Sequence, residues 1–323
     1  MGTPPPEEPE NTTERAPRIA PPPQPPSSVL YGPNGLRAGW SSFVFTAVLL
    51  ALYFLIGLEM QWLVHDFPSS FRGARGHASH PTMLILWEAS GLLAVLLATA
   101  GMARLENRRT AFYGLAGFDR ARQFFIGLIS GFAFLSLLIG ILVATHRLTL
   151  TWSHMALGRT VQYAAAWGLG FFLVAMTEEL MLRGYLLFTL ARGIRFWPAA
   201  FVLAAVYAAM HNGNPGESPF GLVAVVLIAL VFSLSLWRLG HLWWAIGFHL
   251  TWDWAESFFY GTPDSGVVVS AGRLMRAHPH GALLLSGGTT GPEGSIWVAL
   301  VIALAAVFVW RTQPHRGIRL ARK

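Results

Sequence analysis

Three charged side chains stand inside a stretch of sequence that is otherwise apolar. Between positions 161 and 190 the formally charged residues are Glu178, Glu179 and Arg183. A charge at membrane depth costs ~2.5–3.5 kcal/mol even on the lenient insertion scale, so such residues usually face a bundle interior and serve a function. This stretch is therefore the first candidate for a reactive site.

Helical spacing separates the roles of these charges. Glu179 and Arg183 are four residues apart on one helix face, so they can form an ion pair that lowers the cost of burying both. Glu178 is turned by about 100° from Glu179 and is free to point at another helix. His249 and Asp253 are also four apart, so a second helix presents an imidazole and a carboxylate on one face.

Water activation is the chemistry that such side chains support. A glutamate held near a histidine can take a proton from water as a general base. A second histidine beside another polar group can donate hydrogen bonds to the oxyanion that forms when water attacks an amide carbonyl. No serine or cysteine nucleophile is needed, and no cofactor is required for this reaction.

A metal site is the alternative chemistry. Glu178, His211 and His249 could bind a divalent metal such as zinc, because two histidines and a glutamate with an open position form a known catalytic set. The sequence lacks the H-E-x-x-H pattern, which would place two histidine ligands one helical turn apart. We therefore favour the reaction without metal.

The composition indicates a protein that crosses the membrane many times. Hydrophobic residues make up 54% of the chain and charged residues 12%, against ~25% charged in a typical soluble domain. The net charge of +7 does not indicate nucleic acid, because no soluble basic face with interleaved aromatics is present. The lipid bilayer is the expected partner. The absence of cysteine excludes disulfides, thiolate metal sites and a cysteine nucleophile.

Apolar runs of the length that an ~30 Å hydrocarbon core requires recur along the chain. They predict an all-α, polytopic transmembrane helix bundle of about eight spans, at 40–64, 82–102, 123–145, 161–190, 197–212, 219–237, 241–260 and 295–310. The expected organisation is a disordered Pro-rich cytoplasmic tail (1–38), N-terminal transmembrane helices (39–158), a catalytic helix core (159–260), a long loop that is an ordinary connection or a lid (261–294), and a last helix with a basic cytoplasmic tail (295–323).

Arg and Lys bias predicts that both termini are cytoplasmic. In that orientation 16 of the 23 basic residues fall in inner segments and six in outer loops. Counted at ~1.5 Å per residue from the inner helix ends, Glu178, His211, His249 and Asp253 all lie roughly 12 to 20 Å deep. Four polar side chains from three helices at similar depth favour one shared, water-accessible pocket.

Three motifs resemble those of the CPBP family, which contains the type II CAAX prenyl endopeptidases and Abi-like bacterial bacteriocin-processing or immunity proteins. They are E-E-x-x-x-R at 178–183, aromatic-x-x-x-His from Tyr207 to His211, and H-x-x-x-D at 249–253. The resemblance covers about 160–260, with all three motifs in the family's order. It implies a helical intramembrane endopeptidase, of glutamic or metallo type, with a conical active-site cavity inside the bundle.

The resemblance also implies roles for individual residues. Glu178 and His211 would activate the water, His249 and Asp253 would stabilise the oxyanion, and Glu179 and Arg183 would support the site. Two positions depart from the family pattern: Tyr207 stands where Phe is usual, and Asp253 where many members have Asn. An ionised Asp253 would repel an oxyanion, so it must be protonated or must act by orienting His249.

The expected substrate is a peptide or protein, either membrane-anchored or prenylated, and the expected location is the bacterial plasma membrane. Two other classes of protein remain as alternatives. A non-catalytic scaffold or immunity protein could keep the fold without activity. A proton-coupled transporter also buries Glu, His and Asp near the middle of the bilayer, but it is typically built from repeated halves, and no internal repeat is visible in this sequence.

Overall fold

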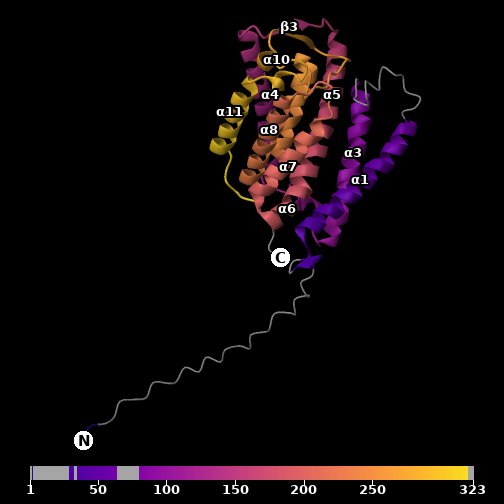
Figure 1. Cartoon of the computed structure of the whole chain (residues 1–323), viewed down its shortest axis with the longest axis vertical. Helices are drawn as coiled ribbons and strands as arrows, with labels where there is room; N and C mark the ends of the chain where they lie inside the picture. Colours follow the sequence, from indigo (N-terminus) through magenta and orange to yellow (C-terminus); the bar gives the residue numbers. More distant parts are fainter. Residues whose placement is uncertain (1, 3–28, 33–34, 64–79, 319–323) are drawn as a thin grey trace.

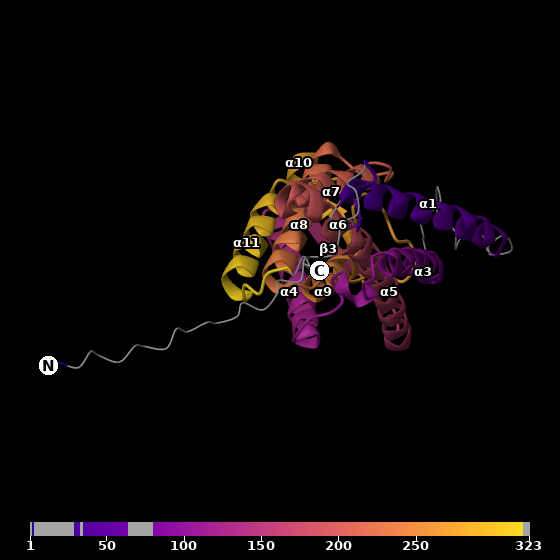
Figure 2. The same ribbon diagram turned by 90° about the horizontal axis from the view of Figure 1, so that it is seen from below.

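The computed structural model describes residues 2, 29–32, 35–63 and 80–318. Most of the expected N-terminal tail (1–38) and the last residues of the basic C-terminal tail lie outside the described residues. Figure 1 shows the helices running alongside one another, and Figure 2 shows α1 and α3 at the edge of the bundle, away from α11. The chain is an integral membrane protein with a polytopic helical fold, as its composition predicts.

All eight expected apolar runs are helical within the described residues. Five segments are long and apolar enough to cross a membrane, and α7 and α11 are shorter apolar helices. The long helices and their continuations are α1 (Ala38–Leu63), α3 (Pro81–Leu105), α4 (Arg120–Ala144), α5 (Leu157–Glu178), η3 (Glu179–Leu186), α6 (Leu187–Ile194), α7 (Phe196–His211), α8 (Pro219–Leu239), α9 (Trp243–Trp254), η4 (Ala255–Tyr260) and α11 (Trp297–Thr312).

Short elements connect the helices. A small antiparallel pair, β1 (Tyr31–Gly32) and β2 (Gly35–Leu36), precedes α1, and η2 (Thr110–Phe112) lies between α3 and α4. The expected loop over 261–294 contains β4 (Met275–Pro279), α10 (Leu283–Ser286) and η5 (Pro292–Gly294). β4 pairs antiparallel with β3 (Leu148–Trp152), which follows α4. β3, with its partner β4, and α10 lie at the end of the bundle opposite the start of α1 (Figure 1).

Helices α4 and α9 pack with their backbones in direct contact. A Cβ atom on Gly131 of α4 would lie 2.3 Å from the Phe248 carbonyl oxygen, and one on Gly247 of α9 would lie 2.3 Å from the Phe124 carbonyl oxygen. The Thr251 hydroxyl also donates to the Leu128 carbonyl at 2.8 Å. Small residues commonly allow such close approach between membrane helices, where lipid provides no hydrophobic driving force. This contact fixes α9, the helix that carries two of the expected site residues.

The expected span 161–190 is not a uniform α-helix. The segment from Leu157 to Ile194 runs through a π-helical stretch, η3, that begins at Glu179 and contains Gly184 with non-helical torsions (φ −78°, ψ −108°). A second π-helical stretch, η4, begins at Ala255, two residues after Asp253. Single π turns within helices occur frequently at functional sites. The first stretch begins directly after Glu178, and the second begins two residues after Asp253.

Candidate functional site

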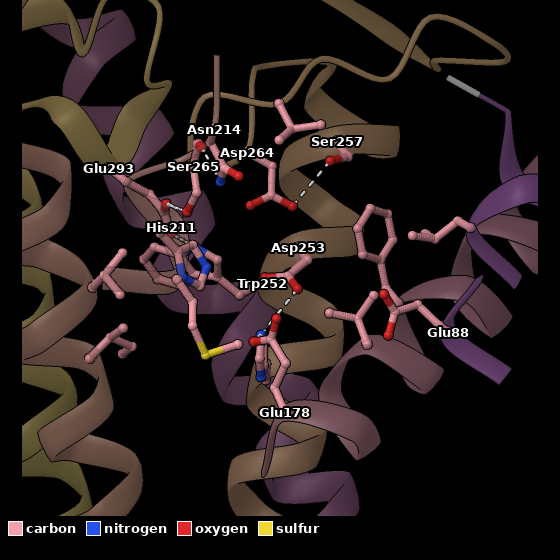
Figure 3. A pocket seen from close by; sticks show the side chains of 18 of the residues that line it. Glu88, Glu178, His211, Asn214, Trp252, Asp253, Ser257, Asp264, Ser265 and Glu293 are labelled. Atoms are coloured by element: carbon pink, nitrogen blue, oxygen red, sulfur yellow. Dashed lines mark hydrogen bonds and ion pairs between the residues drawn. The ribbon is translucent and has the colours of Figure 1, made fainter. Parts of the chain in front are cut away.

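A cavity of about 330 Å³ lies among α3, α5, α7, α8, α9 and the 261–294 segment. The four residues that the sequence marks for chemistry, Glu178, His211, His249 and Asp253, all line it. Figure 3 shows Glu178, Asp253 and His211 facing the same space from different elements. The other polar side chains in its wall are Glu88, Tyr207, Asn214, Ser257, Asp264, Ser265 and Glu293.

Glu178 is the last residue of α5, and its side chain meets α7 and α9. The Tyr207 hydroxyl donates a hydrogen bond of 2.7 Å to Glu178 Oε2. The same oxygen lies 3.6 Å from His249 Nε2, and the Glu178 side chain keeps 21% of its surface exposed. The carboxylate is therefore held on one side and open to the cavity on the other.

His249 lies on α9 among three carboxylates. Its Nε2 is 3.3 Å from Asp253 Oδ2, and its Nδ1 is 3.4 Å from Glu179 Oε1. Phe232 of α8 stacks on the imidazole at 5.5 Å between ring centroids. The ring is thus packed on one face by Phe232, and a carboxylate oxygen lies within ion-pair distance of each of its nitrogens.

The Glu179 and Arg183 pair has the geometry expected from its spacing. Arg183 Nη1 donates to Glu179 Oε1 at 2.8 Å, and the two side chains are 2% and 0% exposed. The Arg183 guanidinium also lies over the Tyr207 ring, 4.5 Å from its centroid. Glu179 also contacts His249, so this carboxylate both compensates the charge of Arg183 and lies against the imidazole.

His211, the last residue of α7, enters the cavity from the opposite wall. Its Nδ1–H donates to the Tyr207 carbonyl oxygen at 2.9 Å, because a carbonyl can only accept. Nε2 is consequently the acceptor nitrogen of the neutral ring. The imidazole packs edge-on against the Tyr207 ring at 4.4 Å.

The proposed metal ligands do not converge on one point. Within the part of the chain that the structure describes, Glu178, His211 and His249 do not form a group whose ligand atoms all lie within 4.8 Å of one another. A group that does is made by Glu256, Asp264 and Glu293 beside the cavity. Burial raises the pKa of the Asp264 carboxyl well above its usual range, and the charges of Asp253 and Glu293 raise it further.

Several cavity residues were not expected from the sequence. Glu88 on α3 is the single formally charged residue of the apolar run 82–102, so the reasoning applied to Glu178 could have found it. Asp264 and Glu293 lie in the segment between α9 and α11, where charged residues are ordinary. Tyr207 was noted only as a substitute for Phe, although its hydroxyl makes the closest contact to Glu178.

Comparison with known proteins supports one family. Residues 160–255 match the model of the type II CAAX prenyl endopeptidase Rce1-like family, and this stretch contains all three motifs. Neither a search of curated proteins nor a search of solved structures found a match. The matched stretch, about a third of the chain, supports a membrane protease of the CPBP family.

Proposed function

We propose that this protein is an intramembrane endopeptidase that hydrolyses a peptide bond with water activated by Glu178 and His211. One observation carries the proposal. The Glu178 carboxylate faces a cavity inside the helix bundle, with the Tyr207 hydroxyl at 2.7 Å and His249 Nε2 at 3.6 Å from the same oxygen. A general base needs this combination of fixed orientation and access to water.

The free side of Glu178 is suited to hold the water. Among the described residues Oε1 accepts no hydrogen bond, whereas Oε2 is held by Tyr207. The acceptor Nε2 of His211 faces the same cavity. As the water oxygen bonds to the carbonyl carbon, its proton passes to Glu178. That proton then moves to the amide nitrogen as the C–N bond breaks, which leaves a carboxylic acid, still carrying the second proton of the water, and an amine.

His249 and Asp253 act on the developing oxyanion. The His249 side chain lines the cavity, and in this proposal its Nε2 donates a hydrogen bond to the carbonyl oxygen as negative charge forms there. Asp253 lies 3.3 Å from the same nitrogen, and its contact supports an orienting role rather than direct contact with the oxyanion. This is the second of the two roles that the sequence leaves open for Asp253.

The proposed reaction uses no metal. The candidate zinc ligands Glu178, His211 and His249 do not fit one ion among the described residues, since their ligand atoms do not fall within 4.8 Å of one another. Titrating a chelator into the cleavage assay tests this directly. Loss of activity that zinc restores would refute the proposal of a reaction without metal.

The substrate is a peptide or protein, and we propose that it is anchored in the membrane by an apolar group, of which a prenyl chain is one form. Apolar side chains make up much of the cavity wall, so an anchored substrate could reach the cavity along them without leaving the bilayer. These apolar side chains include Leu84, Trp87, Trp167, Phe171, Val174, Met210, Val225 and Ile228. Comparing cleavage of a prenylated and an unprenylated peptide of one sequence tests the prenyl form.

For the orientation we propose that both termini face the cytoplasm of a bacterium. The start of α1 lies at one end of the bundle in Figure 1, Arg316 after α11 pairs with Asp119 before α4, and the basic residues favour the end of the bundle where α1 begins. The chain contains no cysteine, so single cysteines introduced before Ala38 and after Thr312 can be labelled with a membrane-impermeant maleimide. Labelling of either one in intact cells would contradict this orientation.

The decisive test of the reaction is Glu178→Gln. This substitution keeps the size of the side chain and removes its ability to take a proton, so cleavage by purified protein should disappear while the melting temperature stays near that of the wild type. Glu59→Gln on the exposed surface of α1 is the matched control and should cleave normally. Cleavage that survived Glu178→Gln would rule out the water-activating role.

The same variant separates the alternative functions. A scaffold or immunity protein would show no cleavage in the wild type and would keep its protective effect in Glu178→Gln. A proton-coupled transporter would move substrate across vesicles under a pH gradient and would lose that movement in the variant.

A further inference from the structure

A cluster of three carboxylates lies beside the catalytic cavity. Oxygen atoms of Glu256, Asp264 and Glu293 all fall within 4.8 Å of one another. The three residues come from separate segments: η4 at the end of α9, the chain that follows it, and η5 before α11. Asp264 and Glu293 also line the cavity, where Figure 3 shows them above Asp253. Negative charges at this spacing repel one another strongly unless something neutralises them.

Glu256 provides the second, independent observation. Its side chain is 0% exposed, and among the described residues neither of its carboxylate oxygens has a hydrogen-bond partner. A buried carboxylate without a donor is unfavourable unless it is neutralised or coordinates a metal. None of the three acids forms an ion pair with Lys, Arg or His in the described part of the chain. Within the described residues, therefore, no cationic side chain compensates Glu256.

The other two carboxylates are oriented by neutral donors. Glu293 accepts from Trp252 Nε1 and from the Ser265 hydroxyl, each at 2.7 Å, and Asp264 accepts from the Ser257 hydroxyl at 3.3 Å. Donors of this kind fix the direction of metal-binding carboxylates without neutralising them. Each oxygen retains a further lone pair for a cation.

We propose that Glu256, Asp264 and Glu293 bind a divalent cation, and that the ion is Ca²⁺. Hard cations take oxygen ligands, and Ca²⁺ accepts them at about 2.3–2.6 Å in flexible geometry. Two such ligands can stand up to about 5 Å apart around one ion, which accommodates oxygen atoms that lie within 4.8 Å of one another. Mg²⁺, at about 2.0–2.1 Å, demands pairs no more than about 4.2 Å apart and near-ideal octahedral geometry.

The surrounding backbone leaves no room for a side chain near the cluster. Gly291 has φ +104°, and a Cβ atom there would lie 2.1 Å from the Pro263 carbonyl oxygen and 3.1 Å from Glu256 Oε1. The absence of a side chain at Gly291 therefore lets the segments that carry Asp264 and Glu293 lie close to Glu256. A bound ion would tie this part of the 261–294 segment to the end of α9 and so hold the wall of the cavity.

The site can be tested with metal alone, independently of cleavage. Full-length protein in detergent is stripped with chelator and titrated with Ca²⁺ by calorimetry; we expect one ion per chain and a rise in melting temperature. Glu256→Gln should weaken Ca²⁺ binding at least tenfold, whereas the matched control Glu178→Gln should bind as the wild type does. Loss of cleavage in Glu178→Gln with Ca²⁺ binding intact would keep the two proposals distinguishable.

A second measurement avoids dependence on a variant that fails to fold. The Trp252 indole donates directly to Glu293, so Tb³⁺ in the site should show luminescence excited through tryptophan that Ca²⁺ displaces. Absence of both calorimetric binding and Tb³⁺ luminescence in the wild type would overturn the proposal and indicate that the acids share protons. Tighter binding of Mg²⁺ than of Ca²⁺ would overturn the assignment of the ion.

Discussion

Removing one member of the buried Glu179 and Arg183 pair should destabilise the protein more than removing both. The two side chains meet at 2.8 Å and are 0% and 2% exposed. Arg183→Met leaves the Glu179 carboxylate buried without its counter-charge. Glu179→Gln likewise leaves the Arg183 guanidinium buried without a counter-charge. The double variant leaves neither charge, and glutamine and methionine are close in size to the residues they replace.

The magnitude follows from the distance and the burial. At 2.8 Å and an effective dielectric constant near 20, the Coulomb attraction is about 6 kcal/mol before desolvation is subtracted. Breaking a buried pair by removing one partner typically costs ~3–5 kcal/mol, whereas replacing the whole pair by residues of similar volume is often close to neutral. Arg183→Met also removes the contact of the guanidinium with the Tyr207 ring, which adds ~1–2 kcal/mol to the loss of unfolding free energy.

A double-mutant cycle measures this coupling. The wild type, both single variants and the double variant are unfolded in detergent micelles by titration with a denaturing detergent and followed by circular dichroism. Each single variant should lose ~3–5 kcal/mol of unfolding free energy, and the double variant should lose less than either single variant. Additive losses would refute the view that the pair compensates for its own burial.

Activity should not recover together with stability. Glu179 Oε1 also lies 3.4 Å from His249 Nδ1, so every variant without this carboxylate loses an acceptor that orients the imidazole. We expect the double variant to be folded and slow, with a reduced kcat and little change in KM. Wild-type kcat in the double variant would show that Glu179 acts on Arg183 alone.

Three further predictions concern packing, the hydroxyl beside the base, and pH. Gly131→Ala should lower the melting temperature, because its Cβ would lie 2.3 Å from a carbonyl oxygen of α9, at a cost of about 1–3 kcal/mol, whereas Gly140→Ala on the same helix, with open space around it, should not. Tyr207→Phe removes a 2.7 Å hydrogen bond to Glu178 of a kind worth ~1.5–3 kcal/mol of stability, so the melting temperature should fall, and kcat should fall about 10- to 100-fold because the carboxylate loses its fixed orientation; an unchanged kcat would contradict that role. Burial alone would raise the pKa of Glu106, but hydrogen bonds from two tyrosine hydroxyls and an arginine outweigh it and hold that pKa below its usual value. Its contribution to stability is therefore present above pH about 4.5 and is lost as the pH falls through the lowered pKa, so Glu106→Gln should lower the melting temperature at pH 7, and the difference from the wild type should shrink as the pH falls below 4.5.

The helices and the central charges could be read from the sequence because a bilayer makes local composition decisive. Every backbone group must be satisfied within its own segment in lipid, so a long apolar run can only be a helix. Charges in such runs are costly, and this is why Glu178, Glu179 and Arg183 stood out. The i, i+4 spacing then predicted the Glu179 and Arg183 contact, which depends on one helix only.

The sequence analysis predicts neither the strand β3 nor the π-helical stretches, for different reasons. Leu148–Trp152 alternates apolar and Thr residues, which is typical of a half-buried strand, but it lies next to the apolar run of α4. The π-helical stretches at Glu179 and Ala255 have no clear sequence signal. They depend on how α5 and α9 pack against their neighbours, which no local pattern records.

The sequence by itself determined a polytopic membrane bundle and the three motifs whose residues face one cavity. Only the tertiary structure decided what surrounds those residues: the Tyr207 hydroxyl on Glu178, the contact of Glu179 with His249, and the acids of the 261–294 segment beside Asp253. The physical reason is the range of the forces involved. Burial in lipid and helical spacing act within one segment, whereas hydrogen bonds and charge repulsion between segments depend on which helices become neighbours.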